Sequence, residues 1–213
     1  VTFYSPYCGH CKRFLPTVKL IAEAFVPDTN VSIARLDCVS YKEFCQENGI
    51  TGFPTIKLIK GEETIEYEGD RSPDDVAEFI NSHCGTERAP NGLLNDAAGL
   101  INETEGIIAE FLTGNKDAAM EKMKAIEGAT FYVKVMERIK EKGVEVVQSD
   151  IATIGKILGE RKGSAASLDS LKKRYNVFSK FESIIHPPTP APTPVPEADA
   201  AQEGDVLPPP KEL

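Results

Sequence analysis

The sequence has no tryptophan, few cysteines and no long hydrophobic run. No apolar segment approaches the roughly 18 to 20 residues that a membrane-spanning helix needs, so we expect no membrane span. Asp and Glu number 33 against 24 Lys and Arg, for a net charge of -9, and no basic cluster is present. Nucleic acid is therefore not an expected partner. Five cysteines among 213 residues are too few for a small protein built on disulfides.

The chain starts inside a regular pattern. Val1–Ser5 already has the composition of a strand, and no signal peptide is present there. We therefore expect that the chain is processed at this point or is a fragment.

Residues 1–85 alternate between strand-like and helix-like segments, which is typical of an α/β layer. The predicted strands are 1–5, 31–36, 55–60 and 64–68, and the predicted helices are 11–25, 41–48 and 73–83. The last helix has a strong start signal, because Ser72 can cap it and Pro73 takes its first position.

Residues 86–181 lose the strand pattern. Apolar residues such as Phe131, Val135 and Ile139 recur at helical spacing, and glycines separate the segments. This predicts an all-helical bundle of about five helices, whose apolar stripes form its core. The region contains no paired carboxylates, metal cluster or phosphate-binding loop in its sequence.

Residues 182–213 are rich in proline and acidic residues. Such a composition predicts a disordered spacer, with a proline-rich ligand for a groove-binding domain as the alternative.

The segment Cys8-Gly9-His10-Cys11 is the strongest chemical signal. The first strand ends before it and a helix begins near Cys8, so unpaired N–H groups and the positive end of the helix dipole face the Cys8 sulfur. A protonated His10 would add a second cation and favour the thiolate further. A free cysteine is only about 3% thiolate at pH 7, whereas one with a pKa below 6 is more than about 90% ionised. Cys11, one turn later, can then resolve a mixed disulfide, so the pair is predicted to form a redox-active disulfide.

Three alternative roles of this cysteine pair stay open. It can be half of a zinc site, although Cys38 and Cys45 lack the spacing of a second pair and we predict no metal. It can be a structural disulfide, or a chance tetrapeptide. No cofactor is expected in any of these cases.

A second motif, Gly52-Phe53-Pro54-Thr55, lies between a predicted helix and a predicted strand. A proline there is hard to place in a trans strand, so we expect a cis proline in a tight turn. Beside the sulfurs, it would offer the backbone of Phe53 or Thr55 to an extended substrate and would keep metal ions out.

In their order and spacing, these motifs resemble a thioredoxin-fold domain of the protein disulfide isomerase family. The resemblance rests on four segments covering residues 1–85, namely Pro6–Lys12, Asp37-Cys38, Gly52–Thr55 and Tyr67–Arg71. It implies that Cys8 is the attacking cysteine, that Cys11 is the resolving cysteine, and that His10 is the residue that tunes their reactivity. It also implies that Pro54 is the cis proline and that Arg71 swings towards the buried cysteine; for Arg71, a solvated loop arginine is the alternative.

The sequence departs from the family in three places. Tyr7 stands where a tryptophan is usual. Thr2 stands where many members have a buried glutamate that accepts the proton of the resolving cysteine, so turnover is expected to be slower. The first strand, the first helix and part of the next strand of the fold are absent, so the domain is expected to be incomplete at its N-terminus and marginally stable.

The resemblance also bears on the other cysteines. Some domains of this family carry a structural disulfide at the place of Cys38 and Cys45, and we expect one here, with two buried free thiols as the alternative. Cys84 is left over as a passive, half-buried thiol. His83 and His186 are expected to be ordinary surface residues.

Residues 86–181 resemble the C-terminal helical domain of the 29-kDa endoplasmic-reticulum protein family, which is linked to client binding. This implies the lumen of the endoplasmic reticulum as the location. The last residues, Pro210–Leu213, match a retention signal poorly. Whether the glycosylation sequons at Asn30 and Asn102 are used is open.

The resemblance implies a thiol–disulfide oxidoreductase that forms, reduces and rearranges disulfides in unfolded client proteins, with an upstream oxidase or glutathione as redox partner. Two alternatives remain. One is a client-binding or escort module without catalysis, and the other is a thioredoxin-like reductant.

Overall fold

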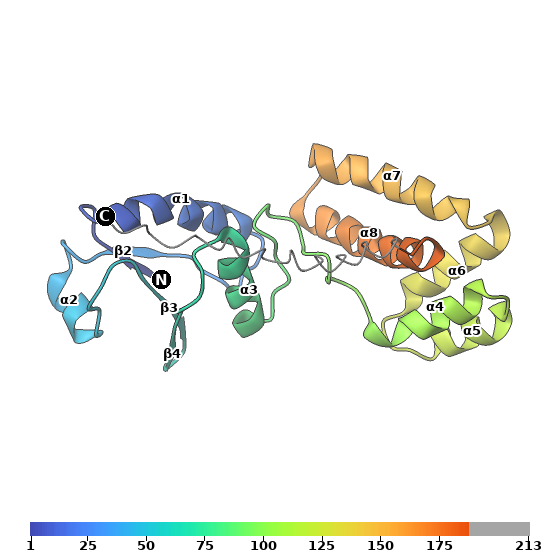
Figure 1. Cartoon of the computed structure of the whole chain (residues 1–213), viewed down its shortest axis with the longest axis horizontal. Helices are drawn as coiled ribbons and strands as arrows, with labels where there is room; N and C mark the ends of the chain where they lie inside the picture. The colour runs from blue at the N-terminus through green and yellow to red at the C-terminus, as the bar shows by residue number, and fades with distance from the viewer. Residues whose placement is uncertain (188–213) are drawn as a thin grey trace, which may run out of the picture.

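The computed structural model describes residues 1–187. It shows an α/β region, residues 1–85, and a helical region, residues 99–185, lying at opposite ends of an elongated molecule (Figure 1). The segment between them has no regular helix or strand until a short 3-10 turn at Asn102–Thr104. The predicted fold class, an α/β layer followed by an all-helical bundle, is confirmed.

The α/β region contains one mixed four-stranded sheet in the order β2-β1-β3-β4. Its strands are β1 (Thr2–Tyr4), β2 (Arg35–Asp37), β3 (Thr55–Lys60) and β4 (Glu63–Glu66), and its helices are α1 (Gly9–Ala24), α2 (Lys42–Glu47) and α3 (Pro73–Cys84). β1 and β2 are parallel, whereas β3 is antiparallel to both β1 and β4. The carboxyl ends of β1 and β2 therefore meet at one edge of the sheet, where the two cysteine motifs follow.

The predicted strand at residues 31–36 is wrong at its start, because only Arg35–Asp37 is a strand. β1 begins at Thr2, which pairs with Arg35. The residues just before Arg35 therefore have no neighbouring strand in the described chain. Val31 and Ile33 still turn their side chains towards α1 and α3, as the period-2 pattern predicted.

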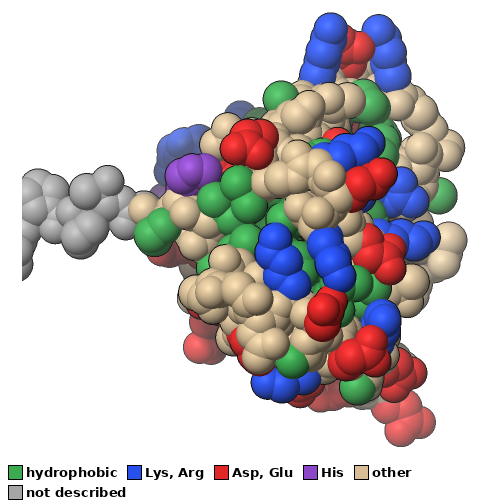
Figure 2. Space-filling view, turned by 90° about the vertical axis from the view of Figure 1, so that its right-hand side faces the viewer, with side chains coloured by type: hydrophobic (Ala, Val, Ile, Leu, Met, Phe, Trp, Pro, Cys, Tyr) green, Lys and Arg blue, Asp and Glu red, His purple; other side chains and the backbone are tan. Residues whose placement is uncertain are grey.

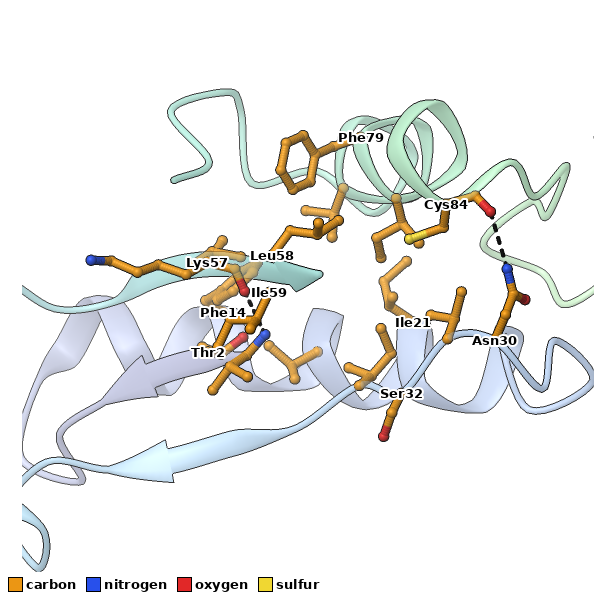
Figure 3. A pocket seen from close by; sticks show the side chains of 17 residues that line it. Thr2, Phe14, Ile21, Asn30, Ser32, Lys57, Leu58, Ile59, Phe79 and Cys84 are labelled. Atoms are coloured by element: carbon orange, nitrogen blue, oxygen red, sulfur yellow. Dashed lines mark hydrogen bonds between the residues drawn. The ribbon is translucent and has the colours of Figure 1, made fainter. Parts of the chain in front are cut away.

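A cavity of about 130 Å³ lies between this part of the sheet and the two helices (Figure 3). Its lining is mainly apolar and includes Phe14 and Ile21 of α1, Leu58 of β3 and Phe79 of α3. The N-terminal ammonium of Val1 donates to the carbonyl of Lys57 at 2.7 Å, and burial lowers its pKa. The core of the α/β region is thus less densely filled than a typical protein interior.

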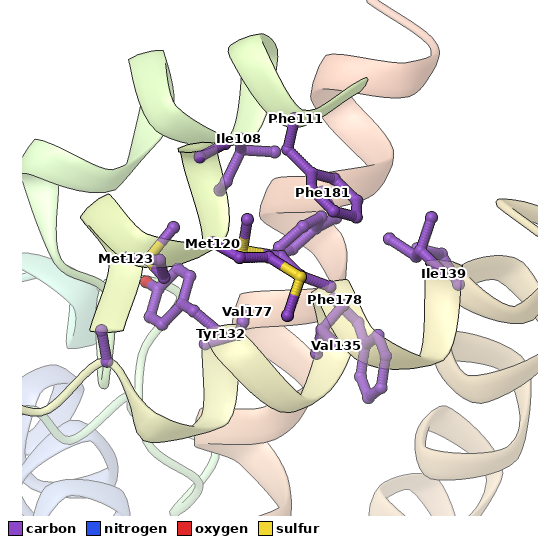
Figure 4. Close-up of a cluster of buried hydrophobic side chains, with 14 residues drawn as sticks. Ile108, Phe111, Met120, Met123, Tyr132, Val135, Ile139, Val177, Phe178 and Phe181 are labelled. Atoms are coloured by element: carbon purple, nitrogen blue, oxygen red, sulfur yellow. The ribbon is translucent and has the colours of Figure 1, made fainter. Parts of the chain in front are cut away.

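The helical region consists of five α-helices, as predicted. They are α4 (Glu105–Leu112), α5 (Lys116–Lys124), α6 (Thr130–Lys142), α7 (Glu145–Glu160) and α8 (Ala165–Ile185). Their core gathers Tyr132 from α6 and Phe178 and Phe181 from α8, each no more than 2% exposed (Figure 4). The Tyr132 hydroxyl accepts a hydrogen bond from the Ile101 N–H at 3.0 Å, which satisfies the one polar group of this aromatic cluster.

The last helix extends past residue 181, where we placed the boundary between bundle and tail. α8 continues to Ile185, because Ile184 and Ile185 still pack against the helical core. Pro187 then follows the C-cap His186, and a residue before proline disfavours the helical conformation. The rest of the predicted tail, residues 188–213, lies outside the described residues.

Arg88 ties the two regions together. Its guanidinium, 2% exposed, binds Asp28 from the loop after α1 and Asp169 from α8, with N–O distances between 2.7 and 3.1 Å. It also donates to the Gly92 carbonyl at 3.2 Å. Since the two carboxylates come from different regions, this double ion pair fixes how the regions sit together.

On the outer end of the helical region, cationic and anionic side chains are interspersed (Figure 2). None of the helices within residues 1–187 is long and apolar enough to cross a membrane.

Candidate active site

Cys8 caps the N-terminus of α1. The sequence Ser5-Pro6-Tyr7 carries the chain out of β1, and the Cys8 N–H donates to the Ser5 carbonyl at 3.1 Å. Cys8 has extended backbone angles, and its sulfur accepts from the Cys11 N–H at 3.5 Å. The first turn of the helix thus points a backbone N–H that has no partner within the helix at the sulfur, as the sequence predicted.

These contacts lower the pKa of Cys8. The largest cause is the hydrogen bond from the Cys11 backbone N–H, followed by one from the Cys11 thiol. The His10 N–H and the charge of Arg13 act in the same direction, while partial desolvation opposes them. All four favourable contacts stabilise the thiolate, which is the nucleophilic form of cysteine.

The predicted role of His10 in tuning Cys8 stays a prediction. The His10 ring is exposed and its Nδ1 lies 2.9 Å from Nη2 of Arg13. Because arginine can only donate, Nδ1 is the acceptor of this contact. A positive charge that acts on Cys8 comes from Arg13, which was not among the predicted site residues. Its position one helical turn after His10 was the available signal.

Gly9 is the first residue of α1 and is exposed. A Cβ built there would meet only Nη1 of Arg13, at 3.9 Å. A glycine at this position leaves the approach to the neighbouring Cys8 sulfur free of side-chain atoms.

Cys11 differs from Cys8 in its burial and in the direction of its pKa shift. It is 1% exposed, and burial is the largest cause that raises its pKa. The contact with the Cys8 sulfur raises it further, whereas the Ser5 backbone and the charge of Arg71 lower it. Both cysteines are free thiols in the structure, and the redox-active pair stays a prediction.

The Phe53–Pro54 peptide bond is cis, and it lies beside the reactive sulfur. The Cys8 thiol donates to the Phe53 carbonyl at 3.5 Å, which brings two segments 45 residues apart into contact. Pro54 is buried, whereas the Phe53 ring is 38% exposed. Thr55 begins β3 and uses its hydroxyl to bond the Gly52 carbonyl at 2.9 Å, which closes the turn.

Arg71 lies on the other side of the cis proline. Its Nη2 donates to the Pro54 carbonyl at 3.3 Å, and its charge reaches Cys11. A polar hollow of about 350 Å³ separates it from Tyr67 and Glu68. A single hydrogen bond, to the Pro54 carbonyl, therefore holds the exposed arginine beside the cis proline.

Thr2 is 5% exposed and carries no charge. No carboxylate is among the main causes that shift the pKa of Cys11. Thr2 itself has no acidic group that could take the Cys11 proton.

Cys38 and Cys45 form a disulfide with a Cα–Cα distance of 5.8 Å. It joins the end of β2 to α2, and the Cys38 N–H donates to the Tyr4 carbonyl at 2.9 Å, next to the loop that leads to Cys8. Cys84 is a free, half-buried thiol that lines the cavity under α3. No cluster of three or more potential metal ligands occurs in residues 1–187.

Comparison with known families divides the chain in two. Residues 1–82 match the Thioredoxin family, and residues 99–181 match the family described as "Endoplasmic reticulum protein ERp29, C-terminal domain". The α/β region with Cys8 falls in the first match, and the five helices, except for the last four residues of α8, fall in the second.

Several curated proteins are similar along most of the chain. A probable protein disulfide-isomerase A6 from Medicago sativa is 32% identical over 85% of this chain and 53% of its own length. Protein disulfide-isomerase 1 from Dictyostelium discoideum is 31% identical over 86% of this chain and 54% of its own length. Protein disulfide-isomerase tigA from Aspergillus niger is 35% identical over 85% of this chain and 52% of its own length.

The chain spans about half the length of these curated relatives. The matched ranges cover both structural regions and the whole candidate site. The chain therefore carries a thioredoxin domain followed by an ERp29 C-terminal domain, and across both it is similar to proteins named protein disulfide-isomerase.

Proposed function

We propose that the chain is a thiol–disulfide oxidoreductase that forms, reduces and rearranges disulfide bonds in client proteins. The observation that carries this proposal is the opposite tuning of two neighbouring sulfurs. Cys8 is accessible and its pKa is lowered, whereas Cys11 is buried and its pKa is raised. This asymmetry sets the order in which the two thiols react.

In the reductive direction, the Cys8 thiolate attacks one sulfur of a client disulfide. A mixed disulfide forms and the other client sulfur leaves as a thiolate. Cys11 then loses its proton and attacks the Cys8 sulfur, which releases the second client thiolate and leaves a Cys8–Cys11 disulfide. The client gains two electrons and the cysteine pair loses two.

The reverse sequence oxidises a client dithiol and returns the pair to the reduced state seen here. Because the contacts around Cys8 stabilise the reduced form, they make the disulfide a better oxidant. When Cys8 leaves a client before Cys11 attacks, the client's disulfides are rearranged without net transfer of electrons. Continued turnover needs a redox partner, for which we propose an upstream oxidase or glutathione.

Arg71 is proposed to assist the step in which Cys11 loses its proton. Its guanidinium already lowers the pKa of Cys11, and a shift from the Pro54 carbonyl towards the sulfur would strengthen this effect. Since Thr2 provides no carboxylate, we expect the proton to leave to water and this step to limit turnover.

Client binding is proposed to use the rim of the site. The Tyr7 and Phe53 side chains, 82% and 38% exposed, flank Cys8 along the sequence and across the cis-proline contact. Exposed aromatic side chains beside a nucleophile suit unfolded proteins, which present apolar residues. We place this activity in the lumen of the endoplasmic reticulum, since the second family match is to a domain of a reticulum protein.

The test is the refolding of a protein with scrambled disulfides, catalysed by the full chain. We expect Cys8→Ser to lose essentially all activity, because serine cannot form the mixed disulfide. Cys84→Ser is the matched control and is expected to keep full activity, since this thiol lies under α3. A Cys8→Ser variant as active as the parent would rule the proposal out.

Two other functions can be distinguished from this one by measurement. An escort module would bind clients with both Cys8 and Cys11 replaced and would show no redox activity before replacement. A thioredoxin-like reductant would show a Cys8–Cys11 reduction potential close to the roughly -270 mV of cytosolic dithiol reductants.

A further inference from the structure

A groove of about 370 Å³ lies between the first turn of α6 and the middle of α8, far from Cys8 in the sequence. Phe131 and Val177 line its apolar part. Three exposed cations, Lys134, Lys173 and Arg174, stand around them. The groove thus combines an aromatic surface with three positive charges.

These charges are uncompensated. No Asp or Glu lines the groove, and none of the three cations makes an ion pair with any residue between 1 and 187. On the outer end of the same region both signs are interspersed (Figure 2). A wholly cationic groove is unusual in a chain with a net charge of -9, and it selects for carboxylates.

The cations are held in place by packing. Gly99 leaves room for the stem of Lys173, since a Cβ at Gly99 would lie 2.9 Å from the Cβ and Cγ of that lysine. The Arg174 guanidinium lies 5.6 Å from the centre of the Phe131 ring, and Phe131 contacts Phe178 edge-on at 5.5 Å. A preorganised arrangement of this kind loses little side-chain entropy when a ligand binds.

We propose that this groove binds the acidic segment at residues 197–205 of the same chain. The segment contains four carboxylates and no Lys or Arg; the acidic residues are Glu197, Asp199, Glu203 and Asp205. It is tethered to α8, the helix that supplies Lys173 and Arg174.

The residues between α8 and the acidic segment are long enough for the segment to reach back to the groove. From Ile185 back to Ser170 along α8 the distance is about 22 Å at 1.5 Å per residue. Residues 186–196, which include six prolines, can span about 34 Å in an extended polyproline conformation at 3.1 Å per residue. A tether of this length gives an effective concentration on the order of 1 mM, so that individually weak, exposed ion pairs are enough to hold the segment.

The first experiment is zero-length carbodiimide cross-linking of the full chain, in an equal mixture of unlabelled and ¹⁵N-labelled protein. We expect peptides that join residues 197–205 to Lys134 or Lys173 within one isotopic species. Lys142 and Lys156 are the internal controls, since both are exposed lysines of the same region without an ion pair in the described chain. Equal cross-linking to all four lysines, or cross-links mainly between the two isotopic species, would overturn the proposal.

The second experiment uses variants. Lys173→Gln with Arg174→Gln is expected to lose the cross-links to Lys134, whereas Lys142→Gln with Lys156→Gln is expected to keep them. All four side chains are exposed, so both variants should fold, and circular dichroism checks this.

The third experiment adds a synthetic peptide of residues 197–205 and follows backbone amide shifts. In a chain with the four acidic residues changed to Asn or Gln, the peptide is expected to shift the amides of Thr130, Phe131 and Ser170. In the intact chain it is expected to shift none of them, because the chain's own segment occupies the groove. Equal shifts in both chains, or shifts in neither, would contradict the proposal.

Discussion

Among residues 1–187, nine of the eleven largest fully buried side chains lie in the helical region, whereas the α/β region contributes only Ile21 and Cys11. The α/β region instead contains a cavity of about 130 Å³ and keeps its reactive sulfur accessible. The cavity is not lined by Cys8 or Cys11, so it is separate from the reactive sulfurs. The difference shows that the helical region provides most of the tightly buried side chains, whereas the α/β region carries the chemistry, and a nucleophile has to stay accessible.

The two regions meet at Arg88, whose double ion pair joins Asp28 and Asp169. Hydrogen bonds and charges from both carboxylates raise the pKa of Arg88 against the effect of burial, so it stays a cation. Substitutions in each region and at the contact between them are therefore expected to have distinct effects.

The largest effect is expected from Phe181→Ala in the helical core. Phe181 is fully buried and its ring lies 6.3 Å from that of Tyr132. Its loss should lower the free energy of unfolding of the helical region by about 3–5 kcal/mol. Chemical denaturation followed by circular dichroism measures this, with Phe44→Ala, at a half-exposed position in α2, as a nearly neutral control. A change in the alkylation rate of Cys8 in Phe181→Ala would mean that the two regions are not independent.

A smaller effect is expected from Arg88→Leu. Removing one partner of a buried ion pair costs about 3–5 kcal/mol, and here about 2–3 kcal/mol is expected because Asp28 and Asp169 remain partly exposed. Small-angle scattering should show a broader distribution of distances between the regions. Arg88→Lys keeps the positive charge but cannot bind both carboxylates bidentately. Its free energy of unfolding and its scattering profile should lie between those of the parent and those of Arg88→Leu. An unchanged scattering profile in Arg88→Leu would show that other contacts fix the arrangement.

The smallest effect is expected from Arg13→Gln. The charge of Arg13 is the last of the causes that lower the pKa of Cys8, so its removal should raise that pKa slightly. The rate of Cys8 alkylation at pH 7 should fall by less than about threefold. Lys12→Gln is the matched control, because Lys12 is also exposed and is not among the main causes that lower the pKa of Cys8. Equal effects of the two substitutions would assign the shift to net charge alone.

The sequence predicts the geometry around Cys8 well because its causes are local. A helix start at a cysteine and a proline after Phe53 fix the N-cap and the cis turn within a few residues. The contribution of Arg13 was not predicted, although it lies only one turn after His10 and its side chain contacts the His10 ring.

What the sequence could not show depends on distant partners. Arg88 pairs with residues 60 and 81 positions away, and nothing near it in the sequence indicates either. The length of β2 depends on where β1 begins, and the last turn of α8 depends on contacts of Ile184 and Ile185 with other helices. Local propensity carries no information about such contacts.

The pH dependence of alkylation at Cys8 and Cys11, resolved by mass spectrometry on the reduced full chain, tests the central claim most directly. Because the folded state lowers the pKa of Cys8 and raises that of Cys11, Cys8 should reach its maximal rate at a pH below that of an ordinary thiol. Cys11 should react only at a pH above it. In denaturant the two midpoints should converge on the ordinary value. Coincident midpoints in the folded chain would contradict the account.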